Sequence, residues 1–392
     1  MGLSSVWGSI SSLVQNIYHL SLIIHRKVTT SILENKYLWR FLLVSILSCF
    51  WGNLTIAQKI KGMSISGPKT PSFKVTMFEA IKTSGSNWVA LIPEATIDRT
   101  TLLLKSDADN DWWSETVAAN IEGIRLAKAA GFKVFLKPHV VLSERLDKKR
   151  SYRAVQVANK KRLKDKTGKA TWRGDLAPKN ETDWQTFEAS YEAYILRLAE
   201  IAEELNVELF SVGTELKQSA WRRPAFWQQL IRKVRAIYSG QLVYAANWDE
   251  YQKITFWKEL DYIGVDTYFP VNRMATPNIK KTVKNWRPIQ RQMRKFSKQH
   301  NRQVLLTEFG YRSVSHAGKR PWTHDKGYAV INNQAQHNLY EAFFQTFWGK
   351  KWIAGGFAWK WFVLPKPTRN STFSMQQKPA MEVLQAWYAL ND

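Results

Sequence analysis

Two glutamates stand where apolar, strand-like segments of the sequence end. Glu215 closes the run 209–215, and Glu308 follows the run 304–307. If both runs are strands of one parallel barrel, both carboxylates lie at its C-terminal end, where such barrels carry their reactive groups. Two facing carboxylates, one protonated and one ionised, can cleave a glycosidic bond. The alternative for each glutamate alone is a structural ion pair, but their matching positions favour catalysis.

Other polar and aromatic residues stand at or just after further predicted strand ends, or in one long loop. Sugar rings have apolar faces, so aromatic side chains beside polar groups suit saccharide binding. Tyr268 is placed to hydrogen-bond a neighbouring carboxylate, and Tyr311 follows Glu308 closely enough to do the same. The predicted substrate-binding residues are His139, Trp172, Asn247, Trp248, Asp266, Tyr268, Tyr311 and Trp359.

Strand-like and helix-like patterns alternate beyond residue 58, as in repeated βα units. The apolar runs are apolar along most of their length, which is typical of strands covered on both faces. The predicted strands are 60–65, 88–93, 133–138, 208–213, 241–246, 262–265, 303–307 and 355–359. The predicted helices are 115–130, 184–205, 224–238, 282–300, 333–348 and 379–390.

Eight strands in this order predict an α/β fold, a (β/α)₈ TIM barrel with some long loops. An open doubly wound sheet is the alternative, but residues 64–68 after the first strand lack the glycine spacing of a dinucleotide site. The longest loop, 143–183, follows the third strand and contains Trp172. It is predicted to form a substrate-binding wall over the barrel mouth, with a disordered insertion as the alternative.

The composition is strongly basic, with 57 Lys and Arg against 32 Asp and Glu and a net charge of +25. No nucleic-acid motif accompanies the basic residues, so the charge favours a solvated surface near an anionic glycan or lipid and no nucleic-acid partner. Of the nineteen Trp, we expect Trp227, Trp257, Trp286 and Trp387 to pack helices. The histidines lack metal-ligand spacing, so we predict no metal and no cofactor.

The N-terminal residues 1–57 have the pattern of a targeting segment, and residues 58–392 are assigned to the catalytic domain. Basic residues precede the apolar run 41–51, which contains the single cysteine, Cys49. An uncleaved signal anchor, a cleaved signal peptide and a lipoprotein signal at Cys49 are all compatible with this pattern, as is a buried helix of the domain. The favoured prediction is a membrane-associated protein that lies outside the cytoplasm.

Several of these segments together resemble glycoside hydrolase family 113, a family of (β/α)₈ barrels whose known activity is endo-β-1,4-mannanase. The resemblance implies that Glu215 is the acid/base and Glu308 the nucleophile of a retaining double displacement. Thr214 departs from the wider clan, in which an Asn often precedes the acid/base residue and contacts the sugar 2-hydroxyl. The segments that carry the resemblance are 136–139, 212–216, 247–248, 264–270 and 307–313.

The leading hypothesis is therefore a retaining glycoside hydrolase that cleaves a β-linked, mannan-like polysaccharide or oligosaccharide. A non-catalytic glycan-binding barrel of the cell envelope is the alternative, because it would keep the same groove and aromatic residues. A basic scaffold protein that binds anionic lipid is a third hypothesis, which the charge alone supports.

Overall fold

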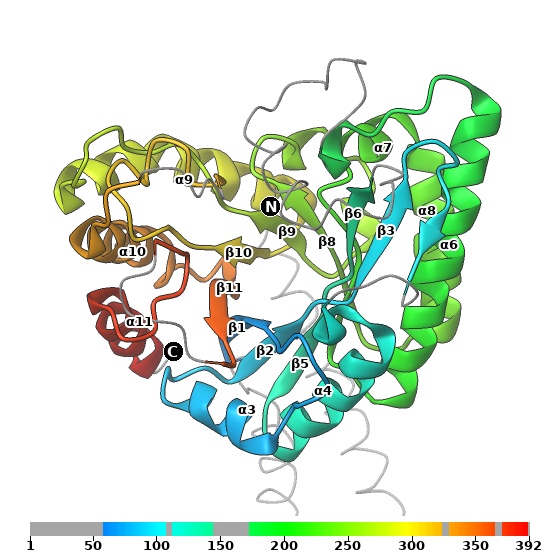
Figure 1. Cartoon of the computed structure of the whole chain (residues 1–392). Helices are drawn as coiled ribbons and strands as arrows, with labels where there is room; N and C mark the ends of the chain where they lie inside the picture. The colour runs from blue at the N-terminus through cyan, green and yellow to red at the C-terminus, as the bar shows by residue number, and fades with distance from the viewer. Residues whose placement is uncertain (1–57, 107–111, 144–171, 324–328, 365–370, 391–392) are drawn as a thin grey trace, which may run out of the picture. The chain divides into compact units, whose positions relative to one another are not determined.

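Eight parallel strands close into a barrel in the computed structural model, which describes residues 58–106, 112–143, 172–323, 329–364 and 371–390 (Figure 1). Neighbouring barrel strands follow the chain order, and β1 closes the barrel by pairing with both β2 and β11. All eight predicted strands are present, so the TIM-barrel prediction is confirmed. The strands are β1 (Ile60–Ser66), β2 (Trp88–Leu91), β5 (Lys133–Leu136), β7 (Leu209–Thr214), β8 (Gln241–Asn247), β9 (Ile263–Asp266), β10 (Val304–Phe309) and β11 (Ile353–Phe362).

The strands are apolar on both faces because one face fills the barrel and the other packs against helices. Inside the barrel, the Phe357 ring packs against Phe135 at 4.8 Å and Trp88 at 6.3 Å between ring centroids. Leu209, Val243 and Leu305 belong to the same cluster. This packed interior places the open part of the site at the C-terminal ends of the strands.

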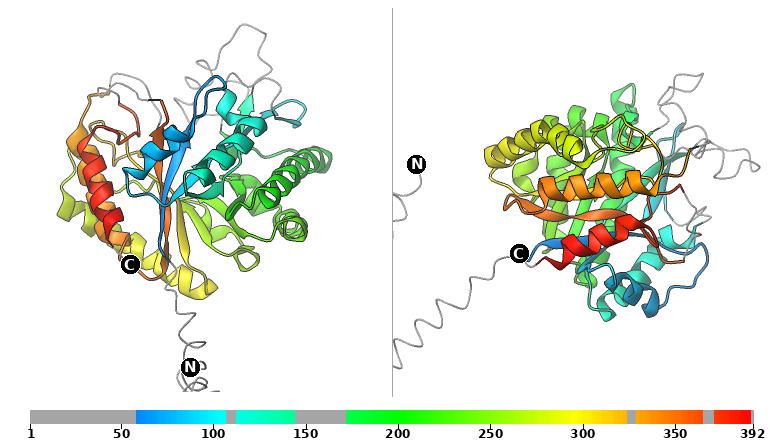
Figure 2. Two further views of the ribbon diagram at one scale, coloured as in Figure 1. Left: turned by 90° about the horizontal axis from the view of Figure 1, so that it is seen from below. Right: turned by 90° about the vertical axis from the view of Figure 1, so that its left-hand side faces the viewer.

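Helices surround the barrel, and Figure 2 shows α9, α10 and α11 side by side on one part of its surface. The six predicted helices are confirmed, whereas α3 and α7 are short and were not predicted. Trp227, Trp257 and Trp286 are fully buried, as expected of packing residues. The helices are α3 (Val75–Lys82), α4 (Val117–Ala129), α6 (Glu181–Glu204), α7 (Lys217–Arg222), α8 (Pro224–Ile237), α9 (Ile279–His300), α10 (Asn333–Phe347) and α11 (Pro379–Ala389), with 3₁₀ turns η1 (Trp113–Glu115), η2 (Arg173–Asp175), η3 (Tyr251–Lys253) and η4 (Trp257–Glu259).

A second, three-stranded sheet extends the barrel mouth and was not predicted from the sequence. It consists of β3 (Glu94–Asp98), β4 (Leu104–Lys105) and β6 (His139–Ser143) in the order β4-β3-β6. Only two residues separate β2 from β3 and β5 from β6, so the chain continues from the barrel directly into this sheet. His139, which directly follows the predicted third barrel strand 133–138, therefore begins β6.

The predicted targeting segment, residues 1–57, and most of the loop 143–183 lie outside the described residues. Among the residues that the structure does describe, no helix has the length and apolarity to cross a bilayer. The membrane association of the N-terminal segment stays a prediction.

Candidate active site

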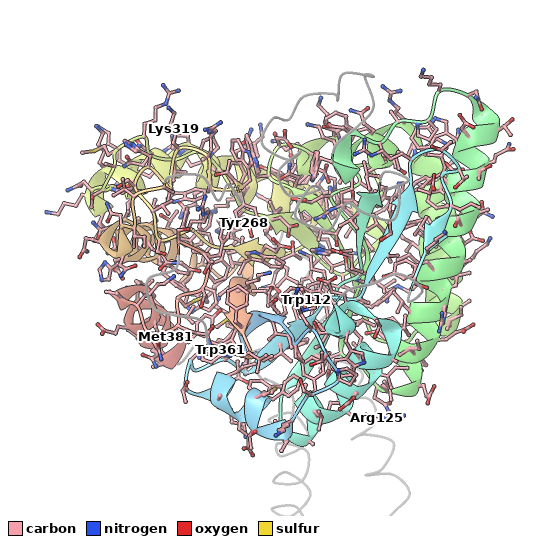
Figure 3. The ribbon with its side chains drawn as sticks, viewed as in Figure 1. Trp112, Arg125, Tyr268, Lys319, Trp361 and Met381 are labelled. Carbon is pink, nitrogen blue, oxygen red and sulfur yellow. The ribbon has the colours of Figure 1, made fainter. Side chains whose placement is uncertain are left out.

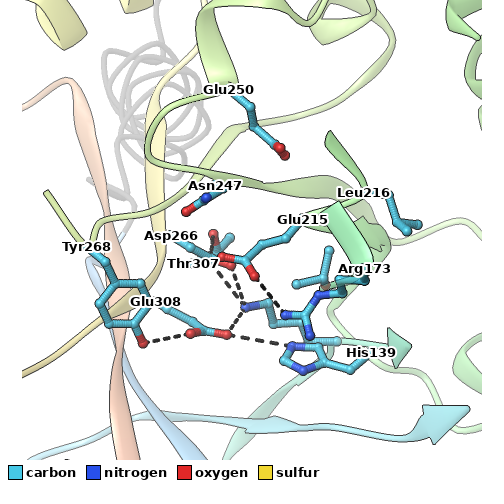
Figure 4. Close-up of polar contacts among 12 residues, drawn as sticks. His139, Arg173, Glu215, Leu216, Asn247, Glu250, Asp266, Tyr268, Thr307 and Glu308 are labelled. Atoms are coloured by element: carbon cyan, nitrogen blue, oxygen red, sulfur yellow. Dashed lines mark hydrogen bonds and ion pairs between the residues drawn. The ribbon is translucent and has the colours of Figure 1, made fainter. Parts of the chain in front are cut away.

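The two glutamates lie at the same end of the barrel, on strands that are separated by β8 and β9. Glu308 is the fifth residue of β10, and Glu215 directly follows β7. Figure 4 shows both carboxylates directed into one space, with Arg173 and His139 beside them. The side chain of Glu308 is only 7% exposed and that of Glu215 only 12%. The expected juxtaposition of the two acids is therefore present.

Three polar side chains surround the carboxylate of Glu308. The Tyr268 hydroxyl donates a hydrogen bond of 2.7 Å to Oε2, as predicted for this tyrosine. The Lys137 ammonium donates to Oε1, and His139 Nε2 lies 3.6 Å from the same oxygen. An ammonium and a hydroxyl, each bound to a different oxygen of the carboxylate, fix its orientation.

Lys137 is fully buried and holds two carboxylates together. Its ammonium lies 3.2 Å from Oδ1 of Asp266, which also accepts a 2.7 Å hydrogen bond from the Thr307 hydroxyl. Burial and the nearby Glu308 carboxylate raise the pKa of Asp266, and Lys137 opposes this rise. Because its side chain is 0% exposed, Asp266 lies beneath the open site and contacts Lys137 rather than solvent.

The backbone around Glu215 has an unusual conformation for a residue that carries a side chain. Its φ angle is +54°, in the left-handed region, and its N–H donates to the Ala245 carbonyl at 2.8 Å. A residue in this region is strained and is held there by its surroundings, which is common at functional sites. Thr214 does not point into the site, because its buried hydroxyl donates to the Pro138 carbonyl.

A buried relay through Tyr244 on β8 and Glu250, the residue before η3, supports the next peptide group. The Leu216 N–H donates to the Tyr244 hydroxyl at 2.8 Å, and that hydroxyl donates to Oε1 of Glu250 at 3.2 Å. Burial raises the pKa of Glu250 well above its ordinary value, and the nearby Glu215 carboxylate adds to the rise. These two bonds fix the turn that aims Glu215 into the site.

Arg173, from η2, forms an ion pair with Glu215 at the barrel mouth. Its Nη2 donates to Oε2 of Glu215 at 2.9 Å, and its side chain is 15% exposed. Burial lowers the pKa of Arg173, but the carboxylates of Glu215 and Glu308 outweigh burial and raise it overall. The ion pair holds the Glu215 carboxylate beside a positive charge.

His139 is buried beside the cations of the site and stacks on an aromatic side chain. Its ring lies 6.1 Å from the Trp359 ring, and the two planes differ by 14°. Burial lowers the pKa of His139 well below its ordinary value, and Arg173 and Lys137 lower it further. The imidazole is therefore neutral at neutral pH, so one ring nitrogen can donate a hydrogen bond to a hydroxyl group and the other can accept one.

This buried neutral histidine predicts a loss of stability in acid. The unfolded chain binds a proton near pH 6.5, whereas folded His139 binds it only at lower pH, so its contribution to stability is present above pH 6.5 and is lost below. We expect the His139→Gln variant to lose less stability than the wild type as the pH falls below 6.5, by up to about 1.4 kcal/mol per pH unit. Thermal unfolding across this pH range measures the difference, and parallel curves would contradict it.

The predicted aromatic residues divide into two groups in the structure. Trp359 and Tyr268 share a small cluster at the mouth, where Trp248 stacks on Trp322 at 5.4 Å. Tyr311 lies instead in the core, 1% exposed and packed against Tyr340, so the structure does not bring it to the two glutamates. Its position two residues after β10 turns it toward the helical layer.

Two other predicted binding residues also have structural contacts. The Asn247 side chain is buried, accepts from the Trp248 N–H at 3.0 Å and donates to Asp249 at 3.1 Å. Trp172 is half-buried and directly precedes η2, so it lies in the chain next to the residue that pairs with Glu215. Asn247 therefore shapes the loop after β8, whereas Trp172 stands beside the mouth.

Three charged residues of the site were not predicted from the sequence. Lys137 interrupts an apolar run at a strand end, and this pattern could have identified it as a site residue. Arg173 lies in a loop, and only the fold determines where that loop lies. Glu94 begins β3 directly opposite His139 in the second sheet. Burial and the neighbouring Glu115 carboxylate raise the pKa of Glu94 to about 8, against the opposing effect of Arg173.

Comparisons with known proteins agree with this fold. The model of Glycoside Hydrolase Family 113 matches residues 69–378. A solved structure of the GH113 β-mannanase AaManA from Alicyclobacillus acidocaldarius, in complex with ManMIm, has a TM-score of 0.69 and 21% identity, covering 85% of this chain and 97% of that one. A GH113 β-1,4-mannanase solved as a complex has a TM-score of 0.66 and 23% identity, covering 84% and 99%.

More distant barrels are also similar in fold. A β-glucuronidase from Ruminococcus gnavus, solved with D-glucuronic acid, has a TM-score of 0.53 and 12% identity, covering 84% of this chain and 49% of that one. The comparison with curated proteins gave no match. The family model covers most of the described barrel, including both glutamates, and the chain therefore belongs to Glycoside Hydrolase Family 113.

Proposed function

We propose that this glycosidase hydrolyses β-1,4-linked mannan by double displacement with retention of configuration. The observation that carries the proposal is the pair of carboxylates at the barrel mouth, each held by a different set of partners. Retaining enzymes need one ionised and one protonated carboxyl group on either side of the scissile bond. Family membership and the similarity to β-mannanases support mannan as the substrate.

Glu308 is the proposed nucleophile. Its two oxygens are held by Lys137 and Tyr268, so the carboxylate cannot rotate freely. In the first step an oxygen of Glu308 forms a bond to the anomeric carbon as the bond to the leaving oxygen breaks. Because Lys137 also pairs with Asp266, the ammonium remains in place when the charge of Glu308 is consumed.

Glu215 is the proposed acid/base. It donates a proton to the leaving oxygen in the first step, and in the second step it accepts one from the water that attacks the glycosyl–enzyme bond. Arg173 stabilises the ionised form, which is the form present after the first step. Trp359, Trp248 and Trp172 are proposed to bind the apolar faces of sugar units, and His139 a sugar hydroxyl.

The ion pair of Glu215 predicts a shift in the pH dependence of activity. Without the Arg173 cation, Glu215 keeps its proton to higher pH, so Arg173→Met should move the basic limb of the kcat/KM profile upward by about one pH unit. The Arg223→Met variant is the matched control, because it breaks a Glu–Arg pair between α6 and the residue before α8 that lies outside the site. An unchanged basic limb in Arg173→Met would show that Glu215 is not the proton donor.

Measuring the release of reducing ends from a panel of β-1,4-mannan, β-1,4-glucan and β-1,4-xylan tests the proposed substrate. We expect release from mannan above the other two, with products of the β-configuration when they are observed immediately by NMR. Release of reducing ends from glucan or xylan alone would assign that polysaccharide as the substrate instead of mannan. Products of the α-configuration would contradict the double displacement.

A further inference from the structure

Helix α9 has an unusual charge content for a surface helix. Its 22 residues include eight Lys and Arg and no Asp or Glu, so it supplies eight of the 25 net positive charges of the chain. All eight side chains are exposed. Helix α6 is of similar length but carries seven acidic residues and one Arg. The cations of α9 are Lys280, Lys281, Lys284, Arg287, Arg291, Arg294, Lys295 and Lys298.

Six of these cations form one stripe along the helix, which we call the basic stripe. They are spaced alternately four and three residues apart: Lys280, Lys284, Arg287, Arg291, Arg294 and Lys298. Each precedes by two residues a member of the inward-facing row that contains Thr282, Trp286, Met293 and Phe296. Two residues correspond to about 200° of rotation, so the basic stripe points directly away from the barrel.

The basic stripe has no countercharge in the part of the chain that the structure describes. None of its side chains makes an ion pair or a hydrogen bond there, whereas cations that face α6 pair with its glutamates, as Arg223 does with Glu188 and Lys233 with Glu192. Like charges three and four residues apart repel one another along a helix. Folding alone does not favour this arrangement, but an anionic partner would.

The position of α9 indicates what kind of partner it meets. Three residues separate the end of the helix from the start of β10, so its last turn lies at the end of the barrel opposite the mouth. The parallel strand β1 also begins at that end. The basic stripe extends for about 27 Å on the outer helical layer, away from the two glutamates. It therefore suits a flat anionic surface better than a polysaccharide held in the mouth.

We propose that the basic stripe of α9 docks this glycosidase on an anionic phospholipid membrane by the flank of its barrel, so that the mouth is not the docking surface. Phosphate headgroups supply the missing negative charge, and Lys and Arg side chains attract them across a Debye length. Exposed Lys319 and Arg320 extend the positive surface, because their segment hydrogen-bonds to the loop before α9 (Figure 3). The proposal is independent of the substrate and of the two catalytic roles.

Binding of the full chain to vesicles tests the proposal. The triple variant Arg287→Gln, Arg291→Gln and Arg294→Gln removes half of the basic stripe and keeps good helix formers. We expect its affinity for vesicles of equimolar phosphatidylcholine and phosphatidylglycerol to fall at least about tenfold relative to the wild type. Affinity for phosphatidylcholine alone should not change, and about 0.5 M salt should abolish the difference. The N-terminal segment is identical in both proteins, so the difference reports on α9.

A second triple variant controls for net charge. Lys74→Gln, Lys82→Gln and Arg125→Gln remove three exposed cations at the two ends of α3 and on α4, and Figure 3 shows Arg125 far from Lys319. It should bind mixed vesicles like the wild type, and all three proteins should hydrolyse polysaccharide equally. Equal vesicle binding by the α9 variant and the wild type would overturn the proposal, as would an equal loss in both variants. Retained vesicle binding with lost binding to soluble alginate would assign the stripe to an acidic polysaccharide instead.

Discussion

Replacing Glu308 with alanine is expected to lower kcat by about 10⁴-fold or more, with little change in the binding of an oligosaccharide. The nucleophile supplies the bond that splits one difficult step into two, so its loss leaves no covalent route. Lys137 keeps Asp266 as a partner in the variant, so the barrel should stay folded. Steady-state kinetics together with calorimetric binding of mannooligosaccharide measure the two effects separately.

Azide provides a sharper version of this test. A small anion can enter the space that the carboxylate leaves and attack the anomeric carbon from the same face. Glu308→Ala with azide should therefore regain activity on a substrate with an activated leaving group and form an α-mannosyl azide. Wild-type activity in Glu308→Ala, or a β-configured azide product, would rule out Glu308 as the nucleophile.

Replacing Glu215 with alanine should have an effect that depends on the leaving group. Polysaccharide needs a proton on the departing oxygen, so its kcat/KM should fall by about 10²- to 10⁴-fold. A dinitrophenyl glycoside leaves without protonation, so its first step should fall far less. Because water then attacks without a base, the glycosyl–enzyme should accumulate, and rapid mixing should show a burst of released phenol.

Glu188→Ala is a matched control for this variant. Glu188 is also 12% exposed and also pairs with an arginine, Arg223, but it lies on α6 outside the mouth. It should lose some thermal stability and keep full activity on both substrates. Equal losses on polysaccharide and on the activated glycoside in Glu215→Ala would show that Glu215 acts by position or packing rather than by proton transfer.

The barrel was predictable because its signal is local. A run such as 304–309 is buried on both faces in the parallel sheet, so apolar side chains without alternation identify it. Parallel strands also place their C-terminal ends together, so a glutamate after each of two such runs predicts a shared site without any contact being known. The spacing of the apolar residues in α9 likewise indicates which face of the helix is buried, and the tryptophans of the helical layer follow the same pattern.

The partners of those glutamates depended on contacts between distant parts of the chain. Lys137 and Glu308 are 171 residues apart, and Arg173 reaches Glu215 from a loop that carries no periodic pattern. The second sheet was missed because β3 and β6 are short and pair across 45 residues of sequence. Tyr311 stands close to Glu308 in sequence, but the turn after β10 places it in the core.

The sequence by itself thus determined the eight-stranded barrel and the two carboxylates at its mouth, because hydrophobic period and strand direction are properties of local segments. Only the tertiary structure decided which cation holds which carboxylate, which aromatic side chains line the mouth, and that the basic stripe lacks a countercharge among the described residues. Those features depend on distances between side chains far apart in the chain, and such distances exist only once the barrel has closed.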